Sequence, residues 1–393
     1  MEIRTLKDIE RLAGQIVMVR ADFNVPIEAG QVKENYKIVR SLPTLKYLIE
    51  KKARIILVSH LGRPAGQEAK YSLAPIREEL EKFLQIKIRL FQLNEFIQLK
   101  KFLEEEMNGG AVAMLENVRF SPDEEKNTNA FSKDLANLAE LFVLDGFAVA
   151  HRGAASVSGV ARYLPAYAGL LLEKEIIGLS RVIENPIKPL VVVLGGVKME
   201  TKIPVLKNLL PKADLVLLGG GISNTFFAAK GYEVGDTVID EEYKKEILSY
   251  ASDEKVIFTV DVVVGEKSGK NFKTLAIDEN FNVPVGQGIY DIGPETIRLF
   301  SKYFQDAETL VWNGAMGYFE QAPYQYGTYA VARLLASRAR GKAFGIAGGG
   351  ETVEVLEKLQ LTDNVDLVST GGGAMLEFLS GKELPGVKIV QVK

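Results

Sequence analysis

Three glycine-rich turns in the second half of the chain have a composition suited to binding phosphate. Gly348-Gly349-Gly350 separates a short apolar run from a stretch with apolar residues at helical spacing, and Gly219-Gly220-Gly221 and Gly371-Gly372-Gly373 each follow an apolar run. Glycine lets the backbone approach a ligand, and a helix start presents free N–H groups and a positive dipole end to an anion. One such turn is most simply a tight connection, but three in one half of the chain indicate phosphate binding.

Two lysines follow a further glycine turn. Gly195-Gly196 comes after Leu190–Leu194 and is followed by Lys198 and Lys202. Residues four apart share a face of a helix, so both ammonium groups would point to the same side. An ordinary charged helix face has the same spacing, but the place directly after a Gly-Gly turn favours two phosphate ligands.

Arginines take the corresponding places in the first half of the chain. Arg20, Arg63, Arg119 and Arg152 each follow an apolar run, and the only two histidines lie beside arginines in these turns. A single arginine after a strand is usually a solvated loop residue, whereas four at the same end of a parallel sheet would converge. Because a guanidinium binds carboxylate and phosphate in a two-pronged manner, the pattern predicts a small substrate with several negative charges.

The elements that must position these residues alternate along the chain. Ten continuous apolar runs predict strands buried on both faces: Ile16–Val19, Ile55–Val58, Val112–Leu115, Phe142–Leu144, Leu190–Leu194, Leu215–Leu218, Val256–Val260, Leu310–Trp312, Phe344–Ala347 and Leu367–Val368. Amphipathic stretches between them predict helices, among them Ser41–Lys52, Leu73–Leu84, Asn129–Leu141 and Thr201–Leu210. This alternation predicts doubly wound α/β sheets, in which ligands bind beyond the carboxyl ends of the strands.

Length and composition restrict the class of protein. The 393 residues are enough for two domains. A net charge of −3 argues against a nucleic-acid partner, and the absence of cysteine excludes disulfides and a cysteine nucleophile. The charged N-terminus has no apolar signal core, and no apolar run approaches the ~18 residues of a membrane span. We therefore expect a cytoplasmic protein with no membrane partner.

The two halves of the chain predict two domains. We expect an N-terminal domain over residues 1–165, a connecting helix within 166–185 and a second domain over 186–379. The helical pattern Gly169–Glu184 ends before Asn185-Pro186. The tail, residues 380–393, is expected to pack back toward the N-terminal domain.

Taken in order, the motifs resemble the phosphoglycerate kinase family. The matching strings run from Arg20 to Val387 and include RADFNVP, SHLGRP, LENVRF, LGGVK, DIGPET, VWNGAMGYFE, GGGET and STGGGAMLE. The resemblance implies two doubly wound α/β domains joined by a hinge helix, and closure of the domains about their ligands. It implies reversible transfer of the ATP γ-phosphoryl to the carboxylate of 3-phosphoglycerate, giving 1,3-bisphosphoglycerate, by a monomer that uses Mg²⁺, with Mn²⁺ as an alternative.

The resemblance also implies roles for individual residues. Substrate binding falls on Asp22, Asn24, Lys37, His60, Arg63, Arg119 and Arg152. Nucleotide binding falls on Lys198, Lys202, Gly220, Gly221, Asn313, Glu320, Gly349, Gly350, Glu351 and Thr352. The catalytic residues are Lys37, Lys198, Gly349 and Gly372, and the metal ligand is Glu351. Because a carboxylate nucleophile is already ionised, such a reaction needs positioning and charge neutralisation rather than a general base.

Four positions depart from the family pattern. Lys37 stands in place of an arginine that meets the transferring phosphoryl, and Glu351 in place of an aspartate that holds magnesium. Ala154 replaces a histidine and Ala315 replaces a proline. Because arginine and lysine are not interchangeable at a bidentate site, our hypothesis is that Arg40, three residues after Lys37, supplies part of the missing charge. The longer acid at Glu351 predicts an altered metal preference, toward manganese.

Three alternatives compete with this interpretation. A nucleotide-binding homologue with impaired catalysis, acting as a scaffold or regulator, is favoured by the Lys37 and Glu351 departures but not by the retained ligand set. A nicotinamide-dependent dehydrogenase is disfavoured because no strand is followed by GxGxxG with an acidic residue about 20 residues on. A nucleic-acid binder is disfavoured by the net charge.

Overall fold

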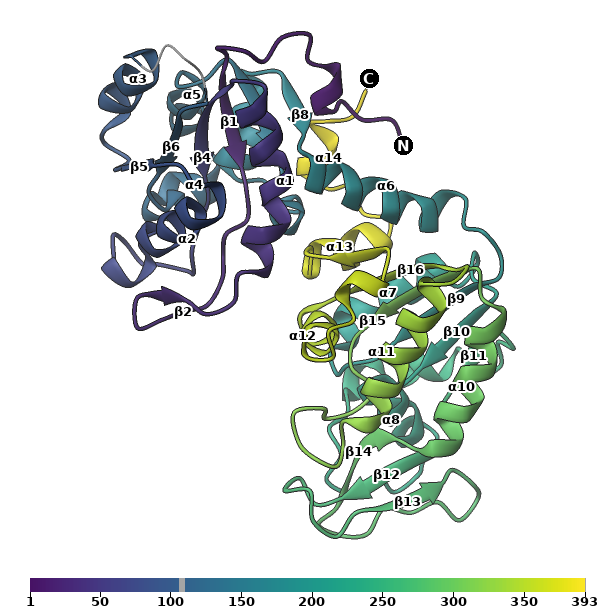
Figure 1. The fold of residues 1–393 in the computed structure, drawn as a ribbon. Coiled ribbons are helices and arrows are strands. Elements are labelled where there is room, and N and C mark those ends of the chain that lie inside the picture. The colour runs from purple at the N-terminus through teal and green to yellow at the C-terminus, as the bar shows by residue number, and fades with distance from the viewer. Residues whose placement is uncertain (106–109, 393) are drawn as a thin grey trace. The chain divides into compact units, whose positions relative to one another are not determined.

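The computed structural model describes residues 1–105 and 110–392 of the chain. It contains two compact units, the first formed by residues 1–177 with 383–393 and the second by residues 178–382. Figure 1 shows that each unit is built around its own sheet with helices packed beside it.

The first unit is organised around a six-stranded parallel sheet in the order β5-β6-β4-β1-β7-β8. Its strands are β1 (Ile16–Arg20), β4 (Arg54–Val58), β5 (Ile88–Phe91), β6 (Val112–Leu115), β7 (Leu141–Leu144) and β8 (Ala166–Ala168), and β2 (Ile27–Glu28) and β3 (Gln31–Val32) form a small hairpin. Its helices are α1 (Tyr36–Glu50), α2 (Ala74–Leu84), α3 (Phe96–Glu105), α4 (Pro122–Lys126), α5 (Asn129–Ala136) and α14 (Pro385–Lys388). Shorter helical turns cover Leu6–Asp8, Ala69–Tyr71, Val118–Phe120, Phe147–Val149, Ala155–Gly159 and Val160–Arg162.

The order of this sheet reverses at β1. The chain passes from β1 through α1 to β4 on one side, and β7 later pairs with the other side of β1. Since crossovers between parallel strands are right-handed, this reversal places helices on both faces of the sheet. The reversal lies at the carboxyl ends of β1 and β7, where the N–H groups of Asp145 and Gly146 donate to the carbonyl of Arg20. Such a switch point is where doubly wound sheets bind ligands.

The chain termini meet on the first unit. The N–H of Arg4 donates to the carbonyl of Val390 at 2.7 Å, and the Arg4 side chain donates to the carbonyl of Ile389 at 2.7 Å. The N–H of Gly386 donates to the carbonyl of Ala150, also at 2.7 Å. A Cβ at Gly386 would come within 2.7 Å of the Ala150 Cα, so this close backbone approach requires glycine.

The second unit contains a parallel sheet of its own in the order β11-β10-β9-β15-β16-β17. Its strands are β9 (Leu190–Leu194), β10 (Leu215–Leu218), β11 (Val256–Ile257), β15 (Thr309–Asn313), β16 (Phe344–Gly348) and β17 (Leu367–Ser369). The helices are α7 (Met199–Leu209), α8 (Gly220–Ala229), α9 (Lys244–Leu248), α10 (Pro294–Asp306), α11 (Tyr326–Ala339), α12 (Gly350–Lys358) and α13 (Gly373–Leu379), with short turns at Glu241–Tyr243 and Thr362–Asn364. Helix α6 (Leu170–Glu184) carries the chain from the first unit into the second.

The order of the second sheet reverses between β9 and β15. These strands pair in parallel with Asn313 opposite Leu194, so the Gly195-Gly196 turn and the turn after Asn313 leave the sheet side by side. The strands β9 and β15 are buried along their whole length, as their continuous apolar runs predict. The switch point therefore lies between a glycine turn and a polar turn.

The structure confirms the two doubly wound sheets and corrects several details. The predicted strand Val256–Val260 is wrong beyond Ile257, because the chain continues into a separate antiparallel sheet, β13-β12-β14. Its strands are β12 (Asp261–Gly265), β13 (Lys273–Ala276) and β14 (Gly288–Ile292), and in Figure 1 this sheet lies at one end of the second unit, beside α8. The helix predicted at Ser41–Lys52 begins five residues earlier, at Tyr36.

Candidate functional site

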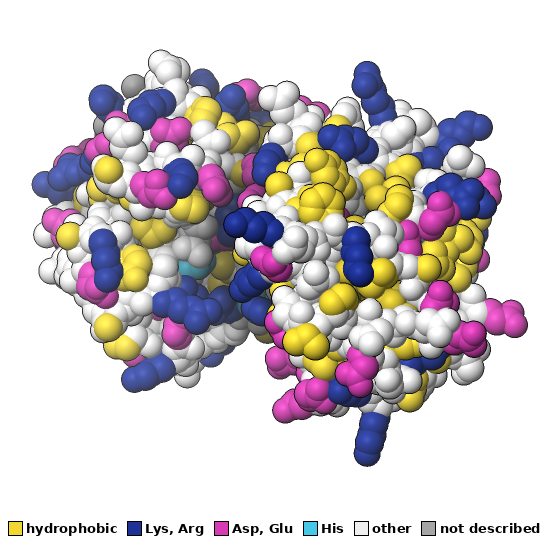
Figure 2. Space-filling model, turned by 90° about the horizontal axis from the view of Figure 1, so that it is seen from below, with side chains coloured by type: hydrophobic (Ala, Val, Ile, Leu, Met, Phe, Trp, Pro, Cys, Tyr) yellow, Lys and Arg dark blue, Asp and Glu magenta, His cyan; other side chains and the backbone are white. Residues whose placement is uncertain are grey.

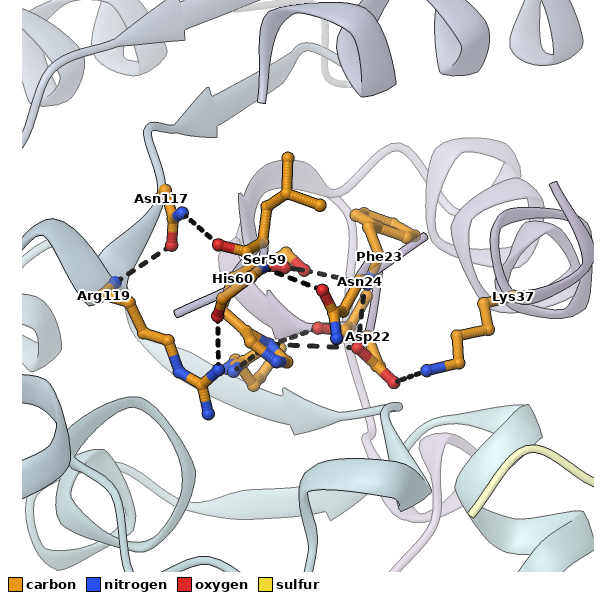
Figure 3. Close-up of polar contacts among 12 residues, drawn as sticks. Asp22, Phe23, Asn24, Lys37, Ser59, His60, Asn117 and Arg119 are labelled. Carbon is orange, nitrogen blue, oxygen red and sulfur yellow. Dashed lines mark hydrogen bonds and ion pairs between the residues drawn. The ribbon is translucent and has the colours of Figure 1, made fainter. Parts of the chain in front are cut away.

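A buried acid at the end of β1 organises the predicted substrate residues of the first unit. Asp22 is 5% exposed, and its Oδ2 accepts an ion-paired hydrogen bond of 2.7 Å from Lys37 Nζ at the start of α1. Its Oδ1 accepts from the N–H of Asn24 at 3.1 Å and lies 3.9 Å from His60 Nδ1. Figure 3 shows Asp22, Asn24 and His60 close together, with the Lys37 side chain directed toward Asp22.

Burial and neighbouring charges determine the protonation states of Asp22 and His60. Burial opposes ionisation of Asp22, but the charge and hydrogen bond of Lys37, with the N–H of Asn24, outweigh it and lower the pKa of Asp22 to about 2. Burial lowers the pKa of His60 well below its usual value, although Asp22 opposes this shift. At neutral pH Asp22 is therefore ionised and His60 is neutral.

The loops around this network hold one another in place. Asn24 Oδ1 accepts from the N–H of Gly62 at 2.8 Å, and Arg119 donates to the carbonyl of Gly62 at 2.6 Å. Gly62 has φ +60°, and a Cβ there would lie 2.3 Å from a ring atom of Tyr71. Glycine is thus required for this loop to bring Asn24 and Arg119 to the same point.

Arg20 is a buried member of the site that the resemblance did not place among the substrate residues. It is 2% exposed, its Nε donates to Ser156 Oγ at 2.7 Å, and its Nη2 lies 3.2 Å from His60 Nδ1. Ser156 in turn donates to Glu124 Oε1 at 2.6 Å. The signal in the sequence was the position of Arg20 directly after an apolar run, but its side-chain partners Ser156 and His60 are far from it in the chain.

Three arginines line a cavity of about 340 Å³ in the first unit. Arg20, Arg119 and Arg152 share its wall with Glu124, Glu125, Gly153, Ala154 and Val157. Burial lowers the pKa of Arg119, and the charges of Arg152 and Arg63 add to this effect. Mutually repelling cations in a partly buried wall favour an anionic ligand. Arg63 itself is exposed, and Figure 2 shows Lys and Arg side chains gathered beside a histidine on this unit.

Three of the glycine turns of the second unit, those at Gly196, Gly349 and Gly372, converge on a cavity of about 330 Å³ at the carboxyl end of its sheet. The wall is formed by Gly196, Val197, Lys198, Thr201, Lys202, Asn313, Gly314, Gly349, Gly350, Glu351, Thr352, Gly372, Gly373 and Leu376. Gly349 and Gly372 have φ +101° and +50° and directly precede α12 and α13. Left-handed glycines therefore direct two helix starts toward this cavity.

The two predicted lysines lie in different environments within this wall. Lys198 is exposed and lies directly before α7, whereas Lys202 is buried and its Nζ donates to Asn313 Oδ1. Asn313 Nδ2 donates to the carbonyl of Gly348 at 2.7 Å, which ties Lys202 to the turn before α12. Burial lowers the pKa of Lys202 to about 8, although Glu351 opposes this shift.

Glu351 is the acidic residue of this cavity. Its Oε2 accepts from the N–H of Ala315 at 3.4 Å, and the neighbouring Thr352 Oγ1 accepts from the N–H of Gly314 at 2.9 Å. No cluster of three or more His, Cys, Asp or Glu side chains suited to a metal occurs within residues 1–105 and 110–392. Since Mg²⁺ is usually held by one or two carboxylates together with phosphates, a single exposed acid in a cavity lined by glycine turns and lysines fits that ion.

A second cavity of the second unit, of about 290 Å³, adjoins the cavity that contains Lys198 and Lys202. Gly196, Val197 and Glu351 line both. Most of its wall is apolar, with Ile289, Ile292 and Phe319 among its residues, and it contains the predicted residues Gly220, Gly221 and Glu320. A Cβ at Gly220 would lie 2.7 Å from the carbonyl oxygen of Ala315. The wall contributed by β12 and β14 was missed in the sequence because this small sheet was not predicted.

A doubly wound fold with an arginine-lined cavity in one unit and a glycine- and lysine-lined cavity in the other defines a phosphotransferase of the α/β class. A comparison with protein families then identifies the particular one. The family model described as phosphoglycerate kinase matches residues 6–382, and the chain belongs to this family.

Curated relatives and solved structures agree with this assignment. The chain is 43% identical to phosphoglycerate kinase of Pelotomaculum thermopropionicum, over 99% of each chain. It is 42% identical to that of Moorella thermoacetica, over 98% of each chain. It superimposes on the structure of phosphoglycerate kinase from Coxiella burnetii with a TM-score of 0.86 at 40% identity, and on that from Pyrococcus horikoshii with 0.83 at 32%, each over 98% of both chains.

The chain is thus an enzyme, a kinase that transfers a phosphoryl group to a carboxylate. The comparisons support this reading and not the alternative of a catalytically impaired scaffold. Within the described part of the chain, every helix is too short or too polar to cross a membrane.

Proposed function

We propose that the arginine-lined cavity of the first unit binds 3-phosphoglycerate and that the paired cavities of the second unit bind ATP with Mg²⁺. The observation that carries this proposal is the segregation of side chains. Buried and half-buried arginines line one cavity, and glycine turns with two lysines line the other. An anion of small size suits the first, and a chain of phosphates suits the second.

In the first unit, Arg119 and Arg152 neutralise the phosphate of the substrate, with Arg63 adding charge from the exposed rim. Asp22, Asn24 and His60 orient the glycerate portion, since an ionised acid, an amide and a neutral imidazole suit hydroxyl hydrogen bonds. Lys37 lies at the start of α1 with its ammonium ion-paired to Asp22. It faces the transferring phosphoryl as part of the catalytic set.

In the second unit, the apolar cavity takes the base and ribose, with Gly220 and Gly221 permitting close approach and Glu320 binding the sugar hydroxyls. The phosphates extend along Lys198, Lys202, Asn313, Gly350 and Thr352. Gly349 and Gly372 direct the N-termini of α12 and α13 at the phosphoryl in transfer. Glu351 would hold Mg²⁺, which when bound would neutralise charge on the nucleotide phosphates.

No general base is required, because the acceptor carboxylate is ionised at neutral pH. The residues contribute positioning and charge neutralisation around the transferring group. We further propose that the chain is a monomeric cytoplasmic enzyme. Its domains, residues 1–165 and 186–379 joined by a helix within 166–185 and followed by a tail over 380–393, close about a hinge and exclude water.

The proposal is tested by steady-state turnover with ATP and 3-phosphoglycerate, measured with Mg²⁺ and with Mn²⁺, for the wild type and Glu351→Asp. We expect ATP-dependent formation of an acyl phosphate, and a ratio of Mn²⁺ to Mg²⁺ activity that is higher in the wild type than in Glu351→Asp. The reason is that the longer side chain of Glu351 moves the carboxylate relative to the phosphates. Equal ratios in the two proteins would remove the assigned effect of Glu351 on metal preference.

A further inference from the structure

The loop after β15 is fastened to the start of α12 by two backbone N–H groups. Gly314 donates to Thr352 Oγ1 at 2.9 Å and Ala315 donates to Glu351 Oε2 at 3.4 Å. The carbonyl of Ala315 accepts from the N–H of Gly196 at 2.7 Å. The N–H that faces Glu351 is therefore held from both sides, by the turn after β9 and by α12.

The environment of Glu351 Oε2 differs from open solvent. A Cβ built on Gly196 would lie 3.6 Å from Glu351 Oε2 and 3.8 Å from Lys202 Cε, so this oxygen faces the turn that carries the buried lysine. The charges of Glu351 and Lys202 attract each other. Both the Ala315 N–H and the Lys202 ammonium thus draw Oε2 to the inner wall, at the boundary where Glu351 lines both cavities.

An unrestrained glutamate would be a poor ligand for a metal of strict geometry. Its carboxylate moves about three side-chain torsions, and fixing them on binding costs conformational entropy. Mg²⁺ accepts only near-ideal octahedral placement of its ligands. A hydrogen bond that orients the carboxylate before the metal arrives reduces this cost.

We propose that the backbone N–H of Ala315 is a positioning group for the metal, holding Oε2 of Glu351 so that Oε1 is presented to the cation between the two cavities. The inference rests on the proposed role of Glu351 as metal ligand. It also makes residue 315 a position where proline, which has no N–H, is incompatible with a glutamate at 351.

The test measures Mn²⁺ affinity of the protein with ADP by electron paramagnetic resonance, which requires no turnover. Ala315→Pro removes the N–H, and Ala315→Gly, which keeps it, is the matched control. Because a hydrogen bond to a charged group is lost, we expect Ala315→Pro to weaken Mn²⁺ binding roughly three- to tenfold and Ala315→Gly less than about twofold. The unfolding temperature without metal and ADP verifies that each variant is folded.

The same substitution in the Glu351→Asp background separates the contact from a change in loop shape. The shorter side chain draws its carboxylate away from the N–H, so Ala315→Pro should have no further effect there. Equal weakening in both backgrounds would overturn the inference. Glu351→Ala separates the metal role of Glu351 from the positioning role of Ala315. If Glu351→Ala binds Mn²⁺ like the wild type, the proposed metal role fails. If Glu351→Ala weakens Mn²⁺ binding but Ala315→Pro does not, only the positioning role fails.

Amide hydrogen exchange gives a second measurement that does not depend on the proline variant folding. In Glu351→Ala the Ala315 amide should exchange faster than in the wild type, because its acceptor is gone. The Gly314 amide, which is bonded to Thr352, should keep its rate and serves as the internal control. Unchanged protection of the Ala315 amide would contradict the contact on which the inference depends.

Discussion

At the scale of single residues, some charged side chains of the first unit are paired with one another and others remain to bind an anion. Asp22 is ionised and takes up the ammonium of Lys37 at 2.7 Å, while His60 is neutral. The positive charge left for an anion then comes from the arginines. Lys37 alone is an incomplete replacement for a guanidinium, since part of its charge is already paired.

Arg40 is the nearest candidate for the missing charge. It lies one turn from Lys37 on α1, with its guanidinium carbon 5.8 Å from the centre of the Tyr36 ring. Its Nε is buried and, within the described residues, forms no hydrogen bond. We predict that Arg40→Ala lowers kcat roughly tenfold or more, because a charge-assisted contact to the phosphoryl is lost.

Steady-state kinetics of four variants examines this prediction. Arg40→Lys should recover part of the activity, and Lys46→Ala, which removes an exposed lysine from the same helix, should leave kcat within about twofold of the wild type. If Arg40→Ala turns over normally while Lys37→Ala abolishes turnover, Arg40 has no part in the reaction.

At the scale of elements, the start of α12 depends on a backbone conformation that only glycine adopts readily. Gly349 has φ +101° and ψ 143°, and a Cβ there would lie 3.0 Å from Asn313 Nδ2. We predict that Gly349→Ala destabilises the protein by roughly 1–3 kcal/mol and weakens ATP binding, because Asn313 is displaced and with it Lys202.

Chemical denaturation of Gly349→Ala and Gly350→Ala provides the comparison. Gly350 is the first residue of α12, has no positive φ, and a Cβ there would meet nothing within 4 Å. Gly350→Ala should therefore leave the free energy of unfolding unchanged or raise it slightly. A loss of stability of equal size in both variants would indicate that the strained φ of Gly349 is not the cause.

The sequence predicted elements well where burial is continuous. Leu190–Leu194 is the strand β9 residue for residue, because both faces of that strand are covered. The strand β13 has three exposed residues out of four, so it carries no apolar run to detect. The apolar cavity wall from β12 and β14 depends on that small sheet and was missed with it. Arg20 was noticed after its strand, but its bonds to Ser156 and His60 are tertiary and have no local signature.

At the scale of the whole molecule, each unit places its ligand groups at the reversal of a parallel sheet. In the first unit the loop after β1 carries Asp22 and Asn24. In the second unit the turn after β9 carries Lys198, and β15 ends at Asn313. The same topology is thus used twice with different side chains. We accordingly assign one substrate to each unit.

That assignment is tested most directly by calorimetric titration of 3-phosphoglycerate and of ATP with Mg²⁺ into Arg152→Ala and Lys198→Ala. Arg152 lines the cavity of the first unit and Lys198 lines a cavity of the second. Each substitution therefore removes a charged contact to one ligand only. We predict that Arg152→Ala weakens 3-phosphoglycerate binding roughly tenfold or more with ATP binding nearly unchanged, and that Lys198→Ala does the reverse. Weakening of both ligands to the same degree in either variant, or of the opposite ligand, would contradict the account.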